Sequence, residues 1–109
     1  MTAATLTEQN FRLEADRALE QAQRDLLPLA DAEGFEVELQ NGVLQVIFDE
    51  PSPMKFVVSP NAPVRQVWVS ALSRSFKLSW AGDAATFTLD GERLSVLLDR
   101  LAREHLQAV

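Results

Sequence analysis

Two glutamates placed two residues apart are the first side chains in this sequence of 109 residues whose spacing could support chemistry. Glu36 and Glu38 lie in the stretch FEVEL, where they alternate with Phe35, Val37 and Leu39. Residues i and i+2 of a β-strand project from one face, with backbones about 6.6–6.8 Å apart. Two carboxylates at that spacing could share a hydrated hard cation, because hard cations prefer oxygen ligands. The pattern equally suits a strand with one face in water, and both interpretations stay open at this point.

A tryptophan on the polar side of another expected strand is the second unusual feature. In RQVWVSA, Val67 and Val69 alternate as a buried face should, whereas Trp68 falls between Gln66 and Ser70. Burying an indole removes roughly 150–250 Å² from water, so an indole that faces solvent asks for another reason. Aromatic side chains of this size often carry binding energy at protein interfaces. Trp68 is therefore a candidate contact residue for a partner.

Ordinary enzyme chemistry finds little support in the residue types present. The sequence contains no glycine-rich phosphate loop, no GxSxG and no HExxH. Cysteine is absent, which excludes disulfides and thiolate metal ligands. The only histidine, His105, follows Leu101 by four residues, and we interpret it as a histidine at the edge of a helix. A carboxylate-only site for a hard cation is the metal chemistry that remains.

The charge of the chain is negative and unevenly distributed. The net charge of −6 argues against binding to the phosphate backbone of nucleic acids. Residues 1–50 hold eleven acidic and three basic residues, whereas residues 51–109 hold seven basic and five acidic ones. This asymmetry suggests that the two halves meet different partners, although a solvated helix face together with chance is the more common explanation in small proteins. No apolar run is long enough to span a bilayer, and MTAATLTEQN shows no secretory signal, so we expect a cytoplasmic protein.

The elements that must position these residues begin with a helix. Thr7 is a suitable N-cap, and apolar residues recur at spacings of three and four from Phe11 to Leu29. Pro28 disfavours a helical Leu27, so we expect the helix to fray there and ADAEG to form a loop. A second helix follows Asp-Gly near the C-terminus, with a buried stripe formed by Leu94, Leu97, Leu98, Leu101 and Ala102.

Between the helices lie about six strand-like runs: FEVEL, VLQVIF, MKFVVS, RQVWVSA, SFKLSW and AATFTL. Asn41-Gly42 predicts a tight hairpin between the first two, whereas Pro60 and Pro63 should confine SPNAP to a loop. Trp80 has the inward parity of its strand and is expected in the core.

Each strand has one apolar face and each helix one apolar stripe, which together predict an α+β fold. We expect a single domain over residues 1–109: a two-layer α-β sandwich with both helices on one face of a mainly antiparallel sheet. Residues 1 to about 6 should form a disordered tail. The other face of the sheet would then display Glu36, Glu38, Gln45, Lys55, Gln66, Trp68, Ser70, Lys77, Ser79, Thr86 and Thr88.

The sequence resembles the frataxin family, in particular its bacterial members, from about residue 9 to residue 104. The most specific part is NAPVRQVWVSA, which is similar to the family's proline-containing loop followed by a basic residue, Gln, and a Trp between two aliphatic residues. NGVLQVIF resembles a hairpin strand of the family, FKLSW its aromatic-rich strand, and LDGERLSVLLDRL its final leucine-rich helix. The fold implied is the same helix–sheet–helix sandwich.

The resemblance implies an accessory role in iron–sulfur cluster assembly, with a cysteine desulfurase and a scaffold protein as partners. Frataxins bind Fe(II) or Fe(III) weakly through surface carboxylates and are not regarded as conventional enzymes, although iron oxidation has been attributed to some. The implied iron ligands are Asp25, Asp31, Glu33, Glu36 and Glu38. The implied partner-binding residues are Arg65, Gln66, Trp68, Ser70, Glu36 and Glu38. The implied protein is a monomer of the bacterial cytoplasm that binds neither nucleic acid nor membrane.

One stretch departs from the family. Frataxins usually carry a dense run of Asp and Glu in the last turns of the first helix, where this chain reads QAQRDLLPLADAEG. We therefore expect iron binding that is micromolar or weaker and sensitive to salt. The acidic surface could also steer the protein toward a basic patch on a desulfurase. Two alternatives stay open: a small acidic chaperone of the secretion type, generally dimeric, and an accessory domain without a metal role.

Overall fold

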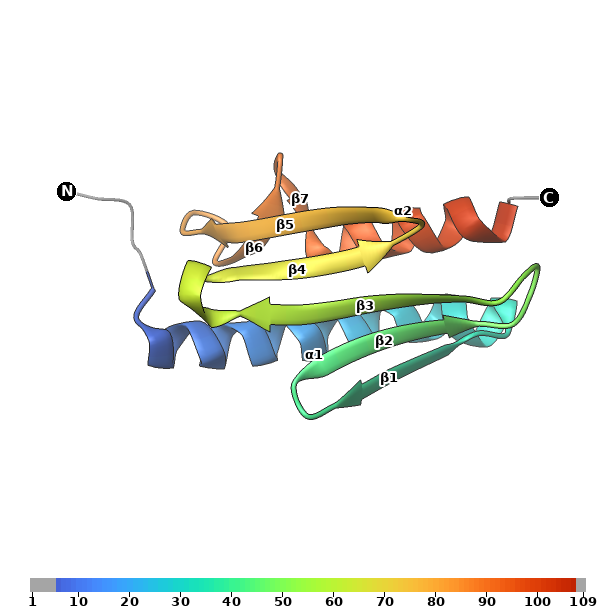
Figure 1. Cartoon of the computed structure of the whole chain (residues 1–109), viewed down its shortest axis with the longest axis horizontal. Helices are drawn as coiled ribbons and strands as arrows, with labels where there is room; N and C mark the ends of the chain where they lie inside the picture. The colour runs from blue at the N-terminus through green and yellow to red at the C-terminus, as the bar shows by residue number, and fades with distance from the viewer. Residues whose placement is uncertain (1–5, 108–109) are drawn as a thin grey trace.

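The computed structural model describes residues 6–107, which form two helices and seven strands (Figure 1). The expected disordered tail concerns positions outside this range, apart from Leu6, which packs against the core. Neither described helix combines the length and apolar character needed to cross a membrane. The elements are α1 (Glu8–Glu33), β1 (Glu36–Gln40), β2 (Val43–Phe48), β3 (Met54–Asn61), the 3-10 helix η1 (Ala62–Val64), β4 (Gln66–Ala71), β5 (Arg74–Ala81), β6 (Thr86–Leu89), β7 (Glu92–Arg93) and α2 (Leu94–Gln107).

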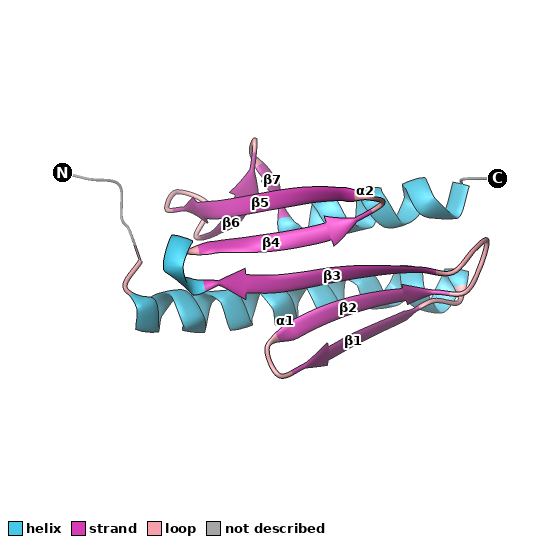
Figure 2. Cartoon of the chain, in the orientation of Figure 1, coloured by secondary structure: helices cyan, strands magenta, loops and turns pink. Residues whose placement is uncertain are grey.

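All strands pair antiparallel in the order β1-β2-β3-β4-β5-β6-β7, and both helices cover one face of the sheet (Figure 2). The two-layer α-β sandwich expected from the sequence is confirmed. The strand beyond the six expected ones is β7, two residues that follow Asp90-Gly91 and pair with the end of β6. A strand of two residues has no periodicity by which it could be recognised.

The core fills the space between the helices and the inner face of the sheet. Phe48 lies at its centre, with ring centroids 4.6 Å from Phe35 and 5.1 Å from Phe56. Trp80 packs against this core, as its parity predicts, and meets Phe87 edge to face at 5.3 Å. The inner face of the sheet is therefore used mainly for packing, whereas the outer face is not covered by the two described helices.

Helix α1 does not end near Pro28, so this expectation was wrong. The helix continues to Glu33 and ends at Gly34, whose φ of 81° allows its N–H to bond the carbonyl of Ala30 at 2.8 Å. Pro28 itself is exposed, whereas Leu26 and Ala30 on either side of it are buried. Packing of this buried stripe compensates for the backbone hydrogen bond that the proline removes.

Strand β3 runs through Pro60 to Asn61, although the sequence predicted a loop there. Pro60 lies opposite Val67 of β4. The pairing of β2 with β3 reaches only to Leu44 and Val58, so this end of β3 has β4 as its sole neighbour. Proline is tolerated in such an edge-like position because its missing N–H removes no bond of the ladder. Pro63 lies in the following 3-10 helix.

His105 is buried, which corrects its interpretation as a helix-edge residue. Its exposed fraction is 4%, its ring lies 4.7 Å from that of Phe48, and its Nε2 lies 3.1 Å from the carbonyl oxygen of Ser52. The contact joins the last turn of α2 to the loop between β2 and β3. His105 thus belongs to the packing of the fold.

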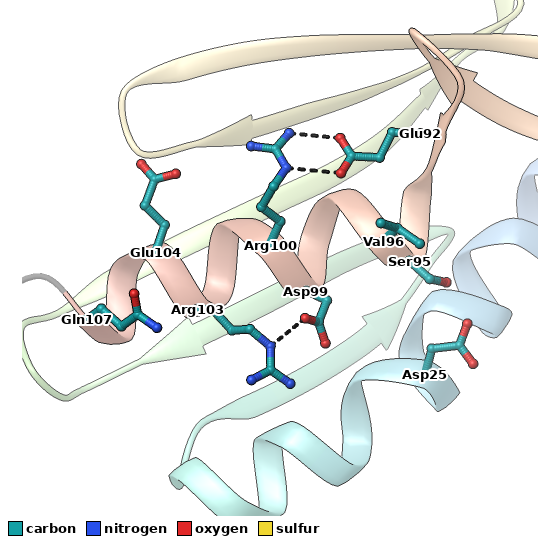
Figure 3. Close-up of a pocket in the computed structure, with 9 residues that line it drawn as sticks. All are labelled: Asp25, Glu92, Ser95, Val96, Asp99, Arg100, Arg103, Glu104 and Gln107. Carbon is teal, nitrogen blue, oxygen red and sulfur yellow. Dashed lines mark hydrogen bonds and ion pairs between the residues drawn. The ribbon is translucent and has the colours of Figure 1, made fainter.

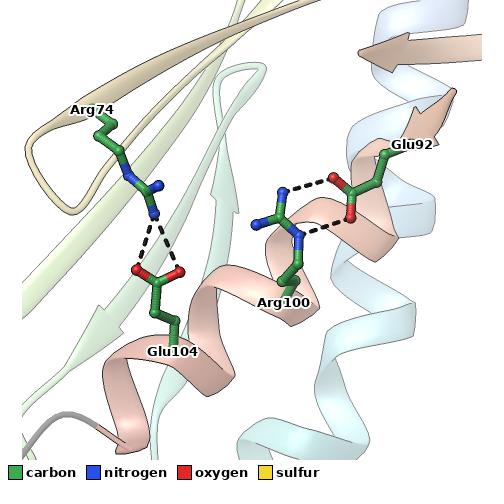
Figure 4. A network of polar contacts seen from close by, with 4 residues as sticks. All are labelled: Arg74, Glu92, Arg100 and Glu104. Carbon is green, nitrogen blue, oxygen red and sulfur yellow. Dashed lines mark hydrogen bonds and ion pairs between the residues drawn. The ribbon is translucent and has the colours of Figure 1, made fainter. Parts of the chain in front are cut away.

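Two ion pairs join α2 to the sheet (Figure 4). Arg100 donates from Nη2 and Nε to the two carboxylate oxygens of Glu92 at 2.8 and 3.0 Å. This hydrogen bonding lowers the pKa of Glu92 and raises that of Arg100. Arg74, at the start of β5, donates to both carboxylate oxygens of Glu104 at 3.3 and 3.1 Å. The pairs therefore join the middle and the C-terminal part of α2 to the sheet.

Candidate functional site

Trp68 projects from the outer face of the sheet, on the side opposite the helices. Its neighbours Val67 and Val69 are 0% and 1% exposed, so they fill the core while Trp68 points away from it. Across the sheet Trp68 lies opposite Ser59 of β3 and Lys77 of β5. The orientation predicted from alternation is therefore the one found.

The indole is held by its neighbours on this face. Trp68 donates from Nε1 to Oε1 of Gln66 at 2.9 Å, and Nε2 of Gln66 in turn donates to Oγ of Ser79 at 3.3 Å. The ammonium of Lys77 lies 4.8 Å from the centre of the indole ring, within the range of a cation–π contact. The side chain is thus ordered before any partner arrives, and a partner would lose less side-chain entropy on binding it.

Two aliphatic side chains extend the apolar part of this face, and the sequence did not identify them. Val57 lies diagonally from Trp68, because Val57 pairs with Ser70, two residues further along β4. Ile47 lies diagonally from Val57 on the next strand, and both side chains are half-buried. Diagonal neighbours are about 7–8 Å apart, within reach of large side chains. The nearly continuous apolar run VLQVIF was the available signal, because it places apolar residues on both faces of β2.

The glutamates of β1 lie on the same face as Trp68. One cross-strand row runs from Glu38 through Gln45 and Val57 to Ser70, across three strand spacings or about 14 Å. Glu36 and Glu38 are both exposed, as is Ser70. The outer face therefore brings together five of the six partner-binding candidates: Glu36, Glu38, Gln66, Trp68 and Ser70.

Arg65, the sixth candidate, is engaged elsewhere. It ends the 3-10 helix with a φ of 53°, and its guanidinium donates from Nε to the carbonyl of Leu6 at 3.1 Å and from Nη1 to the carbonyl of Ala62. These bonds hold the chain that enters α1 against the turn before β4. Since Leu6 lies 59 residues away in the sequence, nothing local predicted this use of the side chain.

The five carboxylates implied as iron ligands do not form one group. Asp25 faces α2 and lines a cavity of about 730 Å³ between the two helices (Figure 3). Within that cavity Arg100 pairs with Glu92, and Arg103 pairs with Asp99 at 2.6 Å. Its guanidinium groups are thus already matched by carboxylates. The sheet lies between the helix that carries Asp25 and the outer face.

Asp31 and Glu33 belong to the last turn of α1, whereas Glu36 and Glu38 project from the outer face of the sheet. All four are exposed. Among residues 6–107, no three His, Asp or Glu side chains are arranged closely enough to hold a metal ion. The acidic residues therefore offer exposed single or paired carboxylates on both layers of the molecule.

Comparison with known proteins shows which family has a similar sequence. The family described as "Frataxin-like domain" matches residues 4–108. The protein named "Iron-sulfur cluster assembly protein CyaY" from Janthinobacterium sp. (strain Marseille) is 31% identical over 88% of this chain and 87% of its own. The protein of the same name from Pseudomonas syringae pv. tomato is 32% identical over 95% of this chain and 93% of its own.

A solved structure, that of frataxin from Psychromonas ingrahamii, superposes with a TM-score of 0.65 over 91% of this chain and 90% of that one. At 13% identity this likeness concerns the fold alone. The superposed part covers most of the two-layer sandwich described above. Taken with the match over nearly the whole sequence, it leads to one conclusion: this chain belongs to the frataxin-like domain family.

Proposed function

We propose that this protein is an accessory factor of iron–sulfur cluster assembly that docks through the outer face of its sheet on a cysteine desulfurase and its scaffold. The relatives named above are iron–sulfur cluster assembly proteins. The observation that carries the docking proposal is Trp68, an indole held outward by Gln66 and Lys77 on a sheet face that neither helix of residues 6–107 covers. An ordered aromatic side chain surrounded by polar groups is a frequent centre of binding energy.

The charge of β1 supports a second part of the docking proposal. Glu36 and Glu38 lie on the same face as Trp68 and are exposed, so they can attract a basic surface before contact is made. Such steering acts mainly on the association rate and weakens with salt.

We propose that iron is a weakly held cargo. Exposed carboxylates attract hard cations, but a tight site needs several oxygen ligands around one ion. Glu36 and Glu38, about 6.6–6.8 Å apart along the backbone, can share a hydrated ion and no more. The proposal therefore gives partner docking the leading part and iron binding a subordinate one.

The docking proposal is tested by measuring binding to a cysteine desulfurase, alone and with its scaffold, by calorimetry. We expect Trp68→Ala to weaken binding by about 30-fold, the equivalent of about 2 kcal/mol for a central aromatic residue. Leu13→Ala is the matched control, because it removes an apolar side chain that is 49% exposed on the helix layer. Equal affinities for Trp68→Ala and Leu13→Ala, or no binding by the unmodified protein in either condition, would refute the proposal.

The steering component is tested separately by replacing Glu36 and Glu38 together with lysine. The association rate should fall, and the difference from the unmodified protein should shrink as salt is added. An association rate that is unchanged at low salt would show that these glutamates do not guide docking.

A further inference from the structure

Strand β1 forms a free edge of the sheet, at the bottom of the view in Figure 1. Residues 41–42, with φ of 53° and 74°, make the tight two-residue turn between β1 and β2. Such a turn is closed by a hydrogen-bonded pair, here Gln40 and Val43, and the pairs then alternate along the ladder. The N–H and C=O groups of Val37 and Leu39 consequently point away from β2.

These outward groups have no partner within the part of the chain that the structure describes. The ladder of β1 involves β2 alone, and no loop, cap or side-chain hydrogen bond among residues 6–107 reaches Val37 or Leu39. The opposite edge is divided between β7, which has two residues, and the part of β5 from Arg74 to Leu78, which β6 does not pair. The β1 edge is the unpaired stretch that lies beside the two exposed glutamates.

An exposed leucine continues the apolar side of this edge. Leu27 is 43% exposed and lies eleven residues after Asp16, hence about 20° around the helix from it. Asp16 lines a cavity together with residues 41–43, so this flank of α1 faces the β1–β2 hairpin. Strand β1 runs back along α1 from Gly34. The helix rises about 1.5 Å per residue and the strand about 3.3 Å, so residues 37–39 lie about level with Leu27.

The charges on the outer side of the edge decide what kind of strand can be added. Every antiparallel register that pairs Val37 with Phe35, Val37 or Leu39 of a second copy, and so keeps the apolar side chains on one face, sets one Glu36 or Glu38 directly opposite another. Like charges placed directly opposite destabilise a pairing, whereas opposite charges contribute roughly 0.2–1 kcal/mol per pair. The edge thus disfavours its own copy and favours a strand with basic residues at these positions.

We propose that the β1 edge, made of Val37 and Leu39 with Glu36 and Glu38 outside and Leu27 inside, binds an extended segment of a partner protein as an added strand. In that segment lysine or arginine alternates with apolar residues. The basic side chains lie beside the two glutamates, and the apolar ones cover Val37, Leu39 and Leu27. The proposal rests on the proposed function only in its use of the two glutamates. It differs from docking at Trp68 because the contact is made by the backbone of β1.

The probe for this proposal is a blocked eight-residue peptide that alternates lysine and valine, added to the 15N-labelled full-length protein. Amide exchange at Val37 and Leu39 should slow by about tenfold or more at saturation, because the added strand pairs these groups. A peptide that alternates glutamate and valine should leave both amides unchanged. Perturbation centred on Trp68 in place of Val37 and Leu39 would overturn the proposal.

Val37→Pro and Val37→Ala form the decisive pair of variants. Both remove the branched valine side chain, but only proline removes the outward N–H, and it removes no bond of the β1–β2 ladder. We expect Val37→Pro to bind the lysine peptide at least about tenfold more weakly than Val37→Ala, which corresponds to the loss of a backbone bond and its register. Equal affinities would overturn the proposal.

Two further outcomes keep the test decisive. The combined replacement of Glu36 and Glu38 by lysine should exchange the preference, so that the glutamate peptide protects Val37. If the protein alone forms a dimer by light scattering in which Val37 is already protected, the edge belongs to a second copy and the proposal fails. Peptide binding without any desulfurase binding would refute the proposed function and leave the edge proposal standing.

Discussion

The two tryptophans stand on neighbouring strands but on opposite faces of the sheet, and this provides a direct test of the site. Trp68 belongs to the outer face of β4, and Trp80 packs toward the core from β5. Replacing each in turn by alanine separates a residue kept for binding from one kept for packing. We expect Trp80→Ala to destabilise the fold at least twice as much as Trp68→Ala.

The cost of Trp80→Ala follows from its contacts. Full burial of a tryptophan makes its truncation cost about 3–5 kcal/mol, and an edge-to-face pair such as that with Phe87 contributes about 0.5–1.5 kcal/mol beyond area. Trp80 is only partly buried, so we expect a loss of about 2–3 kcal/mol.

The contacts of Trp68 are weaker. Its hydrogen bond to Gln66 joins two partly exposed side chains, and the Lys77 contact is worth about 0.5–1 kcal/mol at such a site. We expect Trp68→Ala to lower the free energy of unfolding by about 1 kcal/mol, since water replaces the lost hydrogen bond. Its effect on partner binding should be the larger one.

Thermal unfolding and urea unfolding, both followed by circular dichroism, measure both variants without depending on tryptophan emission. For a domain of this size about 1 kcal/mol moves the melting temperature by about 4–8 °C, so the two variants should be resolved clearly. A loss of 3 kcal/mol or more for Trp68→Ala, equal to that of Trp80→Ala, would mean that Trp68 is a packing residue and would refute our assignment.

Further expectations concern the ion pair, the buried histidine, iron and size. Because hydrogen bonding from Arg100 lowers the pKa of Glu92 in the folded state, the pair stabilises the fold above the unfolded pKa, and this stability is lost as the pH falls through the folded pKa. In urea titrations, Glu92→Gln should cost up to about 1 kcal/mol at neutral pH, and the difference should vanish at acid pH; a constant difference would contradict the reasoning. His105→Phe keeps a ring against Phe48 but loses the hydrogen bond to Ser52, so it should lower the free energy of unfolding by about 1 kcal/mol. His105→Ala loses both contacts and should lower it by about 2–3 kcal/mol. Equal losses for the two variants would contradict this account. NMR titration with Fe(II) under nitrogen should broaden, at micromolar or higher concentrations, the resonances of Asp25, Asp31, Glu33, Glu36 and Glu38, and unaffected spectra would remove iron from the proposal. Light scattering should give the monomer mass of 12.1 kDa, whereas a dimer would favour the acidic chaperone.

The parity of strand residues was the most reliable guide in the sequence. It placed Val67 and Val69 in the core and Trp68 outside it, because successive residues of a strand face opposite sides whatever the rest of the fold does. The same rule placed Trp80 against the core and Glu36 beside Glu38. The sheet face of the candidate site was predictable for this reason.

The misjudged features depended on distant parts of the chain. Pro28 signals a helix end locally, but burial of Leu26 and Ala30 against the sheet keeps α1 intact to Glu33. Pro60 signals a loop, but β2 does not extend beside Pro60. The missing N–H therefore costs no bond to β2, and β3 continues along β4. Local propensity is overruled in both places by tertiary contacts.

The same limitation applies to side chains of the site. Arg65 follows a loop and precedes Trp68, which made it a reasonable contact residue, yet its donors are used by carbonyls, one of them 59 residues away. Asp25 could be assigned to a helix, but the flank on which it lies depends on where α2 packs. Charge and position in the sequence do not reveal such contacts.

The order of the strands has a consequence for how the chain acquires its structure during synthesis. Each strand pairs with the one that immediately precedes or follows it, so the sheet can grow hairpin by hairpin from contacts close in sequence, which favours rapid folding. The inner face of that sheet, however, is covered in part by α2, which follows every strand in the chain. A nascent chain that has not yet released Leu94–Gln107 from the ribosome therefore carries a nearly complete sheet with part of its apolar face open to water. Closure of the core therefore waits for α2, and the negative charge of the first half of the sequence favours a dispersed chain until then.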